Sequence, residues 1–398
     1  MGVSLCDGID WVGAVDWEVR DFHGYDTARG TTYNAYLVRD EKTALIDTVK
    51  APFAGELLGN LAGAADPASV DYVVCNHAEP DHAGALPEVM AALPNAALVC
   101  TEKCRQTLAM YFDMSEWGVR ILAPGESLSL GARTLEFVQT PLAHWPESMF
   151  TYLPQDGVLF SMDAFGQHYA SAERFDDEAG LAAVMDEART YYANILLPFG
   201  TPTAKAMSAT AKLDLRMIAP SHGVVWRGHI PAILEAYGRW TTGKVRPKVV
   251  VLYDSMWEST AEMAAAVRDG AAGAGAETVL MHLRRGGNIT QMASEVLEAA
   301  AVAVGSPTLN GTMMPAVGGA LTYLQGLKPG GKAAVAFGSS GWARGGPESV
   351  NAALEALKWD LVREPVRAEY RPTPEALEAC RDAGRMLAER ALAMAGGM

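Results

Sequence analysis

The stretch CNHAEPDH, residues 75–82, places several possible metal ligands directly after an apolar run at 71–75 that is typical of a buried strand. His77, Glu79 and Asp81 alternate along it, and an extended backbone turns alternate side chains toward one side. Pro80 favours this arrangement, because proline fixes its own φ and keeps the preceding residue out of the helical region. The stretch therefore predicts a metal site at the end of a strand.

Further candidate ligands follow strand-like runs or lie in loops marked by glycine or proline, where sheet-based folds place functional groups. They are His144 in LAHWPES, Asp163 in FSMDAFG and His222 in APSHGVVW. Tyr25 and Trp145 are expected to pack beside the site. The remaining histidines are more simply explained as structural or supporting residues: His23, His168, His229 and His282.

The first half of the chain, residues 1–246, is expected to form mixed sheets with outer helices. Runs at 32–38 and 43–47, joined by the polar turn RDEK, predict a hairpin. Further strands are expected at 71–75, 97–101, 135–140 and 157–161.

The pattern changes near residues 242–248 (TGKVRPK), after which short apolar runs alternate with segments of helical length. We place a second domain at 247–398. Its expected strands are 249–253, 278–283, 301–305, 332–338 and 362–370, and its expected helices are 260–272, 289–299, 315–325, 347–359 and 373–392. Five strand–helix units indicate a doubly wound parallel sheet in the order 2-1-3-4-5, as in flavodoxin-like folds.

Three loops of this sheet are candidates for binding a phosphorylated cofactor. The turn after the first strand carries several hydroxyl residues at a helix N-terminus, a favourable phosphate site, although one hydroxyl would be explained as an ordinary cap. A dinucleotide site is disfavoured because no GxGxxG follows the strand. The candidates are Ser255, Met256, Trp257, Glu258, Ser259 and Thr260, then Ser306, Pro307, Thr308, Leu309, Asn310 and Gly311, and finally Ser339, Ser340, Gly341 and Trp342.

The ligand pattern resembles that of the metallo-β-lactamase fold, an αββα sandwich, except that Glu79 replaces the second histidine of its His-x-His-x-Asp-His motif. With the other ligands retained, it is similar to the flavodiiron proteins, or A-type flavoproteins, and the likeness extends over essentially the whole chain. By that resemblance one iron would be bound by His77, Glu79 and His144, the other by Asp81, His82 and His222, and Asp163 would bridge them. In some members of the family the side chain equivalent to His82 is turned away. FMN would occupy the second half.

The resemblance implies an oxidoreductase that reduces dioxygen to water, nitric oxide to nitrous oxide, or both. A reduced FMN holds two electrons and a diferrous pair two more, which matches the four that dioxygen needs. The electrons would come from an external donor, such as rubredoxin or a reduced deazaflavin, since neither a rubredoxin nor a flavin reductase domain follows the second half. Family members are head-to-tail homodimers or tetramers built from them.

Composition narrows the alternatives. A net charge of -15 without a Lys/Arg run argues against nucleic acid and anionic membranes. No signal peptide or apolar stretch of about 18 residues is present, and five cysteines without a CxxC pair fit reduced thiols, so a cytoplasmic protein is expected. Two other hypotheses stay open: a zinc hydrolase fused to a flavodoxin-like module, against which Glu79 argues, and an electron carrier with a vestigial metal site.

Overall fold

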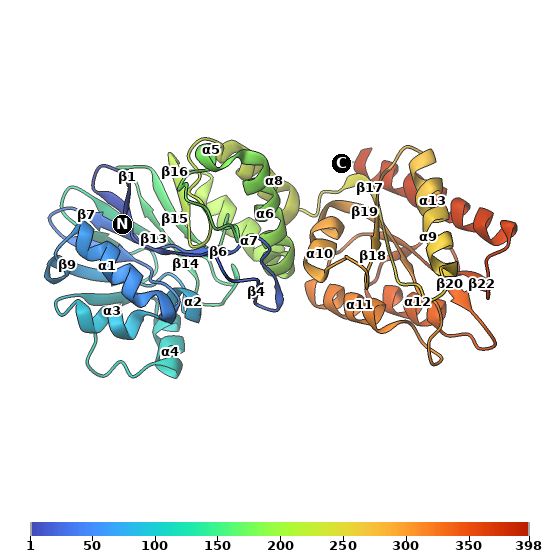
Figure 1. The fold of residues 1–398 in the computed structure, drawn as a ribbon. Helices are drawn as coiled ribbons and strands as arrows, with labels where there is room; N and C mark the ends of the chain where they lie inside the picture. Colours follow the sequence, from blue (N-terminus) through green and yellow to red (C-terminus); the bar gives the residue numbers. More distant parts are fainter. Residues whose placement is uncertain (1, 397–398) are drawn as a thin grey trace. The chain divides into compact units, whose positions relative to one another are not determined.

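The computed structural model describes residues 2–396 (Figure 1). It contains two compact units, of which the first holds the residues up to Tyr192 together with Thr201–Gly238, and the second holds Ala193–Gly200 and the residues from Arg239 onward. A domain boundary between residues 246 and 247 remains our proposal.

The first unit is built on two main sheets. One has the order β1-β2-β7-β8-β9-β10-β11, and the other the order β12-β13-β14-β15-β16. The strands of the first are β1 Val3–Cys6, β2 Ile9–Trp11, β7 Tyr36–Arg39, β8 Thr43–Ile46, β9 Val70–Val74, β10 Ala97–Cys100 and β11 Gly118–Ile121. Those of the second are β12 Ser127–Ser129, β13 Thr134–Gln139, β14 Met149–Leu153, β15 Val158–Met162 and β16 Met217–Pro220. Small ribbons pair β3 Ala14–Asp16 with β6 Thr31–Tyr33, and β4 Asp21–Phe22 with β5 Tyr25–Asp26.

Helices cover the sheets, and Figure 1 shows α1, α3 and α4 along the seven-stranded sheet. The helices of this unit are α1 Ala54–Ala64, α2 Pro80–Ala83, α3 Leu86–Ala92, α4 Glu102–Tyr111, α5 Asp176–Ala179, α6 Leu181–Tyr191, α7 Gly200–Thr210 and α8 Ile230–Thr241. Short 3-10 turns lie at Ala51–Phe53 and Pro67–Ser69. The π turn Tyr192–Leu196 and the 3-10 turn Leu197–Phe199 fall almost entirely in the part of the chain assigned to the second unit, and the last residues of α8 also belong to it.

Alternation along the strands produces the layers. On β7, Leu37 belongs to the core shared with α1, α3 and α4. Its neighbours Tyr36 and Val38 belong instead to the core between the two sheets, together with Phe137 and Phe160. Since adjacent side chains on a strand point to opposite faces, one strand contributes to two cores. The αββα sandwich is thereby confirmed.

The expected strand at 32–38 is interrupted, which corrects that prediction. β6 pairs with β3, whereas β7 pairs with β2 and β8. Asn34 causes the break, because its backbone N–H donates to Ser221 O at 2.8 Å and its side chain donates to Pro220 O at 2.8 Å. The chain therefore leaves one sheet at Asn34 and fixes the loop that carries His222.

The second unit is a parallel sheet in the order β18-β17-β19-β20-β21, with β22 also paired to β20, so the 2-1-3-4-5 order is confirmed. Figure 1 shows helices on both faces of it. The strands are β17 Arg246–Tyr253, β18 Glu277–His282, β19 Ala299–Gly305, β20 Ala333–Ser340, β21 Asp360–Leu361 and β22 Val366–Glu369. The helices are α9 Ser259–Gly273, α10 Ile289–Glu298, α11 Pro315–Leu327, α12 Gly346–Ala356 and α13 Pro374–Gly396.

The fifth strand, expected at 362–370 as one piece, is split into β21 and β22. β21 pairs with Ala333 and Ala334 at the start of β20, and β22 pairs with the end of β20. Pro365 lies in the interruption and has no N–H to donate to a neighbouring strand, which explains the split.

A buried lysine makes the stability of the protein depend on pH. Lys332 is almost fully buried, and its Nζ donates to Leu297 O at 3.1 Å and Ala299 O at 2.6 Å. Burial lowers the pKa of Lys332 to about 7. An unfolded lysine titrates near 10.4, so between these values the unfolded chain binds more protons and the free energy of unfolding increases with pH.

We expect Lys332→Met to remove this increase, which amounts to about 1 kcal/mol per pH unit between pH 7 and 10. Denaturant unfolding at pH 7, 8 and 9 gives the free energy of unfolding of each protein. The value for the variant minus the value for the parent should decrease as the pH increases. The control is Lys205→Met, which removes an exposed lysine. A difference that is constant over this range would contradict the assignment.

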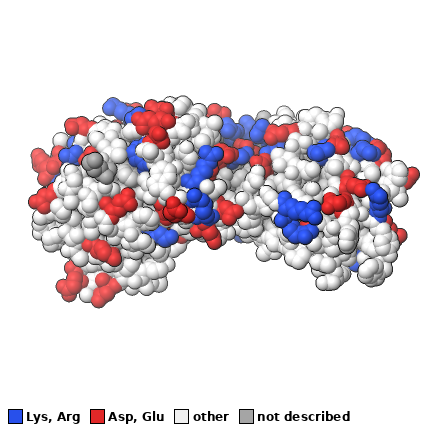
Figure 2. All heavy atoms as spheres, viewed as in Figure 1, with Lys and Arg blue, Asp and Glu red and all other residues white. Residues whose placement is uncertain are grey.

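Charged side chains are mixed on the visible surface. Figure 2 shows Lys and Arg interspersed with Asp and Glu. Within residues 2–396, none of the helices combines the length and apolar character that a membrane crossing needs.

Candidate functional site

The ligand loop after β9 is held by buried hydrogen bonds. The carboxylate of Asp47 accepts from Asn76 N at 2.7 Å and from Asn76 Nδ2 at 2.8 Å. Thr48 Oγ1 donates to His82 O at the far end of the loop. Both ends of the loop are thereby fixed by the chain itself.

Within this loop Glu79 is extended, with φ -64° and ψ 140°, as expected before Pro80. Asp81 is not extended: it lies in α2, which corrects the simple alternation. Pro80 occupies the first helical turn, where its missing N–H has no partner to lose, so the backbone turns into a helix immediately after Glu79. All three candidate side chains still reach one buried space.

His77, Glu79, His144 and Asp163 form the first half of a buried cluster, and their ligand atoms lie within 4.8 Å of one another. Glu79 Oε2 lies 3.1 Å from His77 Nε2 and 3.2 Å from His144 Nε2. Asp163 Oδ2 lies 3.2 Å from the same nitrogen of His144.

Asp81, His82 and His222 form the second half under the same criterion. Asp81 Oδ2 lies 3.2 Å from His82 Nε2 and 3.1 Å from His222 Nε2. His82 is turned into the cluster, because its Nε2 also lies 3.1 Å from Asp163 Oδ1.

Asp163 lies between the two halves. Its Oδ2 faces His77 and His144, whereas its Oδ1 faces His82 and His222, at distances from 3.1 to 3.5 Å. Each carboxylate oxygen therefore addresses a different half, which is the arrangement that a bridging ligand needs.

The electrostatics of the cluster call for cations. Burial opposes the charge on Asp163, but the neighbouring His82 and His144 outweigh it and hold the pKa of Asp163 well below its usual range. Burial likewise opposes the charge on His144, yet hydrogen bonds to Asp163 and Glu79 raise the pKa of His144 to about 10. Neighbouring histidines also lower the pKa values of Glu79 and Asp81 against the effect of burial, so three largely buried carboxylates remain anionic and draw positive charge into the space between them.

Some atoms of the candidate ligands have no hydrogen-bond partner of their own. Asp81 Oδ1 and His82 Nδ1 are buried without one, whereas His82 Nε2 faces the carboxylates of Asp81 and Asp163. Buried polar atoms of this kind are costly unless something binds them. A mixture of imidazole and carboxylate donors suits first-row transition metals. The residues present therefore fit a pair of metal ions.

Sequence reasoning missed two side chains that support the cluster. Tyr191 on α6 donates its hydroxyl to Asp163 Oδ1 at 2.8 Å. Glu147 accepts from His77 Nδ1 at 2.8 Å. A lone tyrosine on a helix carries no signal of this role, although Glu147 stands only three residues after His144.

The other candidates lie around the cluster. The Trp145 ring is 5.0 Å from that of His77, and Tyr25 packs against His168 at 5.6 Å. Two of the remaining histidines contact the cluster: His23 Nε2 is 3.2 Å from Glu79 Oε1, and the ring of His168 lies edge-on to that of His222. The other two lie elsewhere, where His229 forms a hydrogen bond to Asp176 and His282 packs on Tyr253.

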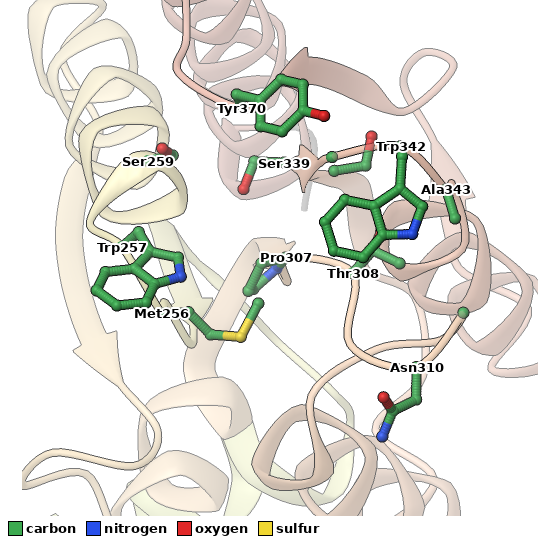
Figure 3. Close-up of a pocket in the computed structure, with 13 residues that line it drawn as sticks. Met256, Trp257, Ser259, Pro307, Thr308, Asn310, Ser339, Trp342, Ala343 and Tyr370 are labelled. Carbon is green, nitrogen blue, oxygen red and sulfur yellow. The ribbon is translucent and has the colours of Figure 1, made fainter.

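A cavity of about 510 Å³ opens at the carboxyl ends of β17, β19 and β20 in the second unit. Figure 3 shows Trp257 and Trp342 on opposite sides of it, with Pro307 between them. Both indoles are almost fully exposed, at 89% and 93%. The candidates that line it are Met256, Trp257, Ser259, Pro307, Thr308, Asn310, Gly311, Ser339, Ser340, Gly341 and Trp342, joined by Ala343 and Tyr370, which were not expected.

The other candidates of these loops are not among the lining residues. Thr260 Oγ1 and Ser339 Oγ are 3.1 Å apart, and Ser306 Oγ accepts from Met314 N at 2.8 Å. Leu309 pairs with Thr312 through its backbone, Glu258 lies 3.3 Å from Arg285, and Ser255 is buried. The hydroxyls of Thr260 and Ser306 thus have partners within the fold, and a contact of these residues with a cofactor stays a prediction.

The turn before α9 suits a phosphate. Ser255 Oγ is buried without a hydrogen-bond partner, and Glu258 at the N-cap makes no side-chain cap. The first N–H groups of α9 are thus left for another acceptor, and a helix N-terminus favours an anion. Two exposed indoles on opposite sides of the cavity suit contacts with a ring system. The cavity therefore fits a phosphorylated, ring-containing cofactor.

Comparison with known proteins agrees with both halves of this description. A family model described as ODP family beta lactamase matches residues 31–223, and a flavodoxin model matches residues 251–384. Fold and site define a class of two-domain redox proteins that join a β-lactamase-like metal site to a flavodoxin domain.

The full-length comparisons then identify the family. A nitric oxide reductase of Moorella thermoacetica is 44% identical over 98% of both chains. The flavodiiron protein of Giardia intestinalis has 40% identity and a TM-score of 0.97, covering 100% of this chain and 98% of its own. Rubredoxin oxygen:oxidoreductase of Desulfovibrio gigas has 38% identity and a TM-score of 0.95 over 99% of both. The chain belongs to the flavodiiron protein family and is an oxidoreductase; these relatives do not support the zinc hydrolase hypothesis.

Proposed function

We propose that this protein reduces dioxygen to water, nitric oxide to nitrous oxide, or both, at two iron ions, with electrons that pass through FMN from an external donor. His77, Glu79 and His144 would hold one ion, Asp81, His82 and His222 the other, and Asp163 would bridge them. The position of Asp163, with one carboxylate oxygen toward each half, carries the proposal. A bound metal pair would supply the redox chemistry and contact both atoms of a diatomic substrate.

The chain itself contributes charge and order. Glu79 adds a negative charge where a hydrolytic zinc site has a neutral imidazole, which favours the higher charge of oxidised iron. Tyr191 holds one oxygen of Asp163 in place. Phe22 packs beside the site, with its ring 6.0 Å from that of His222, and most of the candidate ligands are almost fully buried, which limits their contact with bulk water.

In the second unit, Ser255, Ser259 and the first N–H groups of α9 are proposed to bind the FMN phosphate. Trp257 and Trp342 would contact the flavin ring. This assignment uses the unpartnered Ser255 hydroxyl and the two exposed indoles, which have no other evident role.

Substrate and donor are inferred from chemistry and relatives together. The similar proteins named above are a nitric oxide reductase and a rubredoxin oxygen:oxidoreductase, which supports both gases as substrates. We propose rubredoxin or a reduced deazaflavin as the donor. We also propose a cytoplasmic location and a head-to-tail homodimer, or a tetramer built from two such dimers. This arrangement would bring the flavin of one subunit close to the irons of the other.

Metal and flavin analysis of the purified protein tests this proposal. We expect about two iron ions and about one FMN per chain. Zinc without iron would contradict the proposal and favour a zinc hydrolase. Flavin without metal would favour an electron carrier.

A glycine beside the cavity offers a separate test of the flavin site. Gly345 has φ 152°, and a Cβ there would lie 2.0 Å from Gly311 O. We expect Gly345→Ala to push these two loops apart and weaken FMN binding about tenfold, because an overpacked contact costs about 1–3 kcal/mol. Flavin fluorescence titration measures this, with Gly330→Ala as the control, where a Cβ has nothing within 4 Å. Equal affinities for parent and Gly345→Ala would contradict the site.

A further inference from the structure

The carboxylate of Glu147 contacts the imidazole of His77 on the side that faces away from the cluster. His77 Nδ1 lies 2.8 Å from Glu147 Oε1, and the same oxygen accepts from Ala78 N at 3.2 Å. Both side chains are completely buried. Because the carboxylate accepts at Nδ1, the proton of a neutral His77 is kept there, and the lone pair of Nε2 faces the cluster.

In the other half of the cluster, no carboxylate among residues 2–396 forms a hydrogen bond to Nδ1 of a candidate ligand. His222 Nδ1 donates to a neutral group, the backbone oxygen of Thr32, at 2.6 Å. His82 Nδ1 is buried without a hydrogen-bond partner. The two halves otherwise contribute matched sets, with two imidazoles and one carboxylate each and Asp163 between them. Glu147 therefore introduces a negative charge that acts on one half only.

A carboxylate that accepts from a ligating imidazole orients the ring and increases the basicity of its other nitrogen. Loss of such a partner typically lowers metal affinity about 10- to 100-fold. We propose that Glu147 is a positioning residue that makes the two metal positions unequal: the position at His77, Glu79 and His144 binds its ion first and more tightly. This inference rests on the proposed function, since it presupposes two metal ions.

Anaerobic titration of the metal-free protein with Fe²⁺ against a competing chelator tests the proposal. We expect two binding events in the parent protein, separated by at least about tenfold in dissociation constant. In Glu147→Gln the tighter event should weaken about 10- to 100-fold while both ions still bind. Parent and variant constants that agree within about twofold would overturn the proposal, because the outer carboxylate would then have no measurable effect.

Asp176→Asn is the matched control. Asp176 is also fully buried, and it accepts from His229 Nδ1 at 2.9 Å and from His229 N at 2.7 Å. Asp176 also accepts from the backbone N–H groups of Arg227 and Gly228, and His229 is partly exposed and outside the cluster. The variant therefore perturbs a buried carboxylate that binds an imidazole without touching a candidate ligand, and it should leave both iron constants unchanged. If it weakens iron binding as much as Glu147→Gln does, the effect is general destabilisation and the proposal is wrong.

A double-mutant cycle separates positioning from structural support. In a His77→Ala background, the change of Glu147 to Gln should have no further effect on iron affinity, because Glu147 acts through that ring. A loss of equal size in both backgrounds would contradict the proposal. Circular dichroism of the metal-free proteins checks that they fold. If Glu147→Gln does not fold, Glu147→Asp takes its place, because aspartate keeps the charge but is too short to reach His77 Nδ1. The same loss of iron affinity is then expected. If the parent does not bind two ions, the proposed function fails instead.

Discussion

Asp163→Asn is expected to leave at most about one iron ion per chain and to lower the reduction of dioxygen, of nitric oxide, or of both, whichever the parent reduces, by more than about 100-fold. Loss of an outer partner of a metal ligand already costs about 10- to 100-fold, and Asp163 is proposed as a ligand to both ions. Asparagine keeps the shape but loses the charge. In the parent, Asp163 Oδ2 lies 3.2 Å from His144 Nε2, and Oδ1 lies 3.1 Å from His82 Nε2. In the variant, one of these two oxygens is replaced by an NH₂ group that points at a histidine nitrogen.

Iron content and the rates of oxygen and nitric oxide consumption measure this effect. Asp176→Asn again provides the control for a buried aspartate. An Asp163→Asn variant that retains two irons and activity within about tenfold of the parent would show that Asp163 does not bridge.

Glu79→His has the second largest expected effect. It recreates the imidazole-rich ligand set of a hydrolytic site, so we expect the protein to bind metal but to favour zinc over iron, with the loss of more than about 100-fold in gas reduction. The reason is charge: one of the three buried carboxylates is replaced by a neutral ring, and oxidised iron loses the anion that stabilises it.

Glu79→Gln separates charge from shape in this experiment. Glutamine retains the length of the side chain that now reaches both His77 and His144. If charge is the cause, glutamine and histidine variants should lose comparable activity. A histidine variant that keeps both iron and turnover would remove Glu79 from the explanation.

The clustering of the candidate metal ligands was largely predictable from the sequence, because these residues fall in short motifs that end strands. Four of the candidate ligands lie within the single segment 75–82. In the structure His144, Asp163 and His222 each follow a strand, as expected. What alternation could not show is that α2 begins at Pro80 and turns Asp81 into the site through a helix.

The supporting residues could not be predicted, since their roles depend on packing between distant elements. Tyr191 reaches Asp163 from α6, and Asn34 breaks an expected strand because it binds the loop before His222. In the second unit the sheet order followed from the alternation of strands and helices. Which hydroxyls face the cavity did not follow, because those of Ser306 and Thr260 are used within the fold.

Anaerobic stopped-flow oxidation of the fully reduced protein by dioxygen and by nitric oxide tests the central claim most directly. If Asp163 joins two redox-active ions that draw on FMN, at least one gas should reoxidise the protein much faster than it reoxidises free reduced FMN. Reoxidation by both gases no faster than that of the free flavin would contradict the claim.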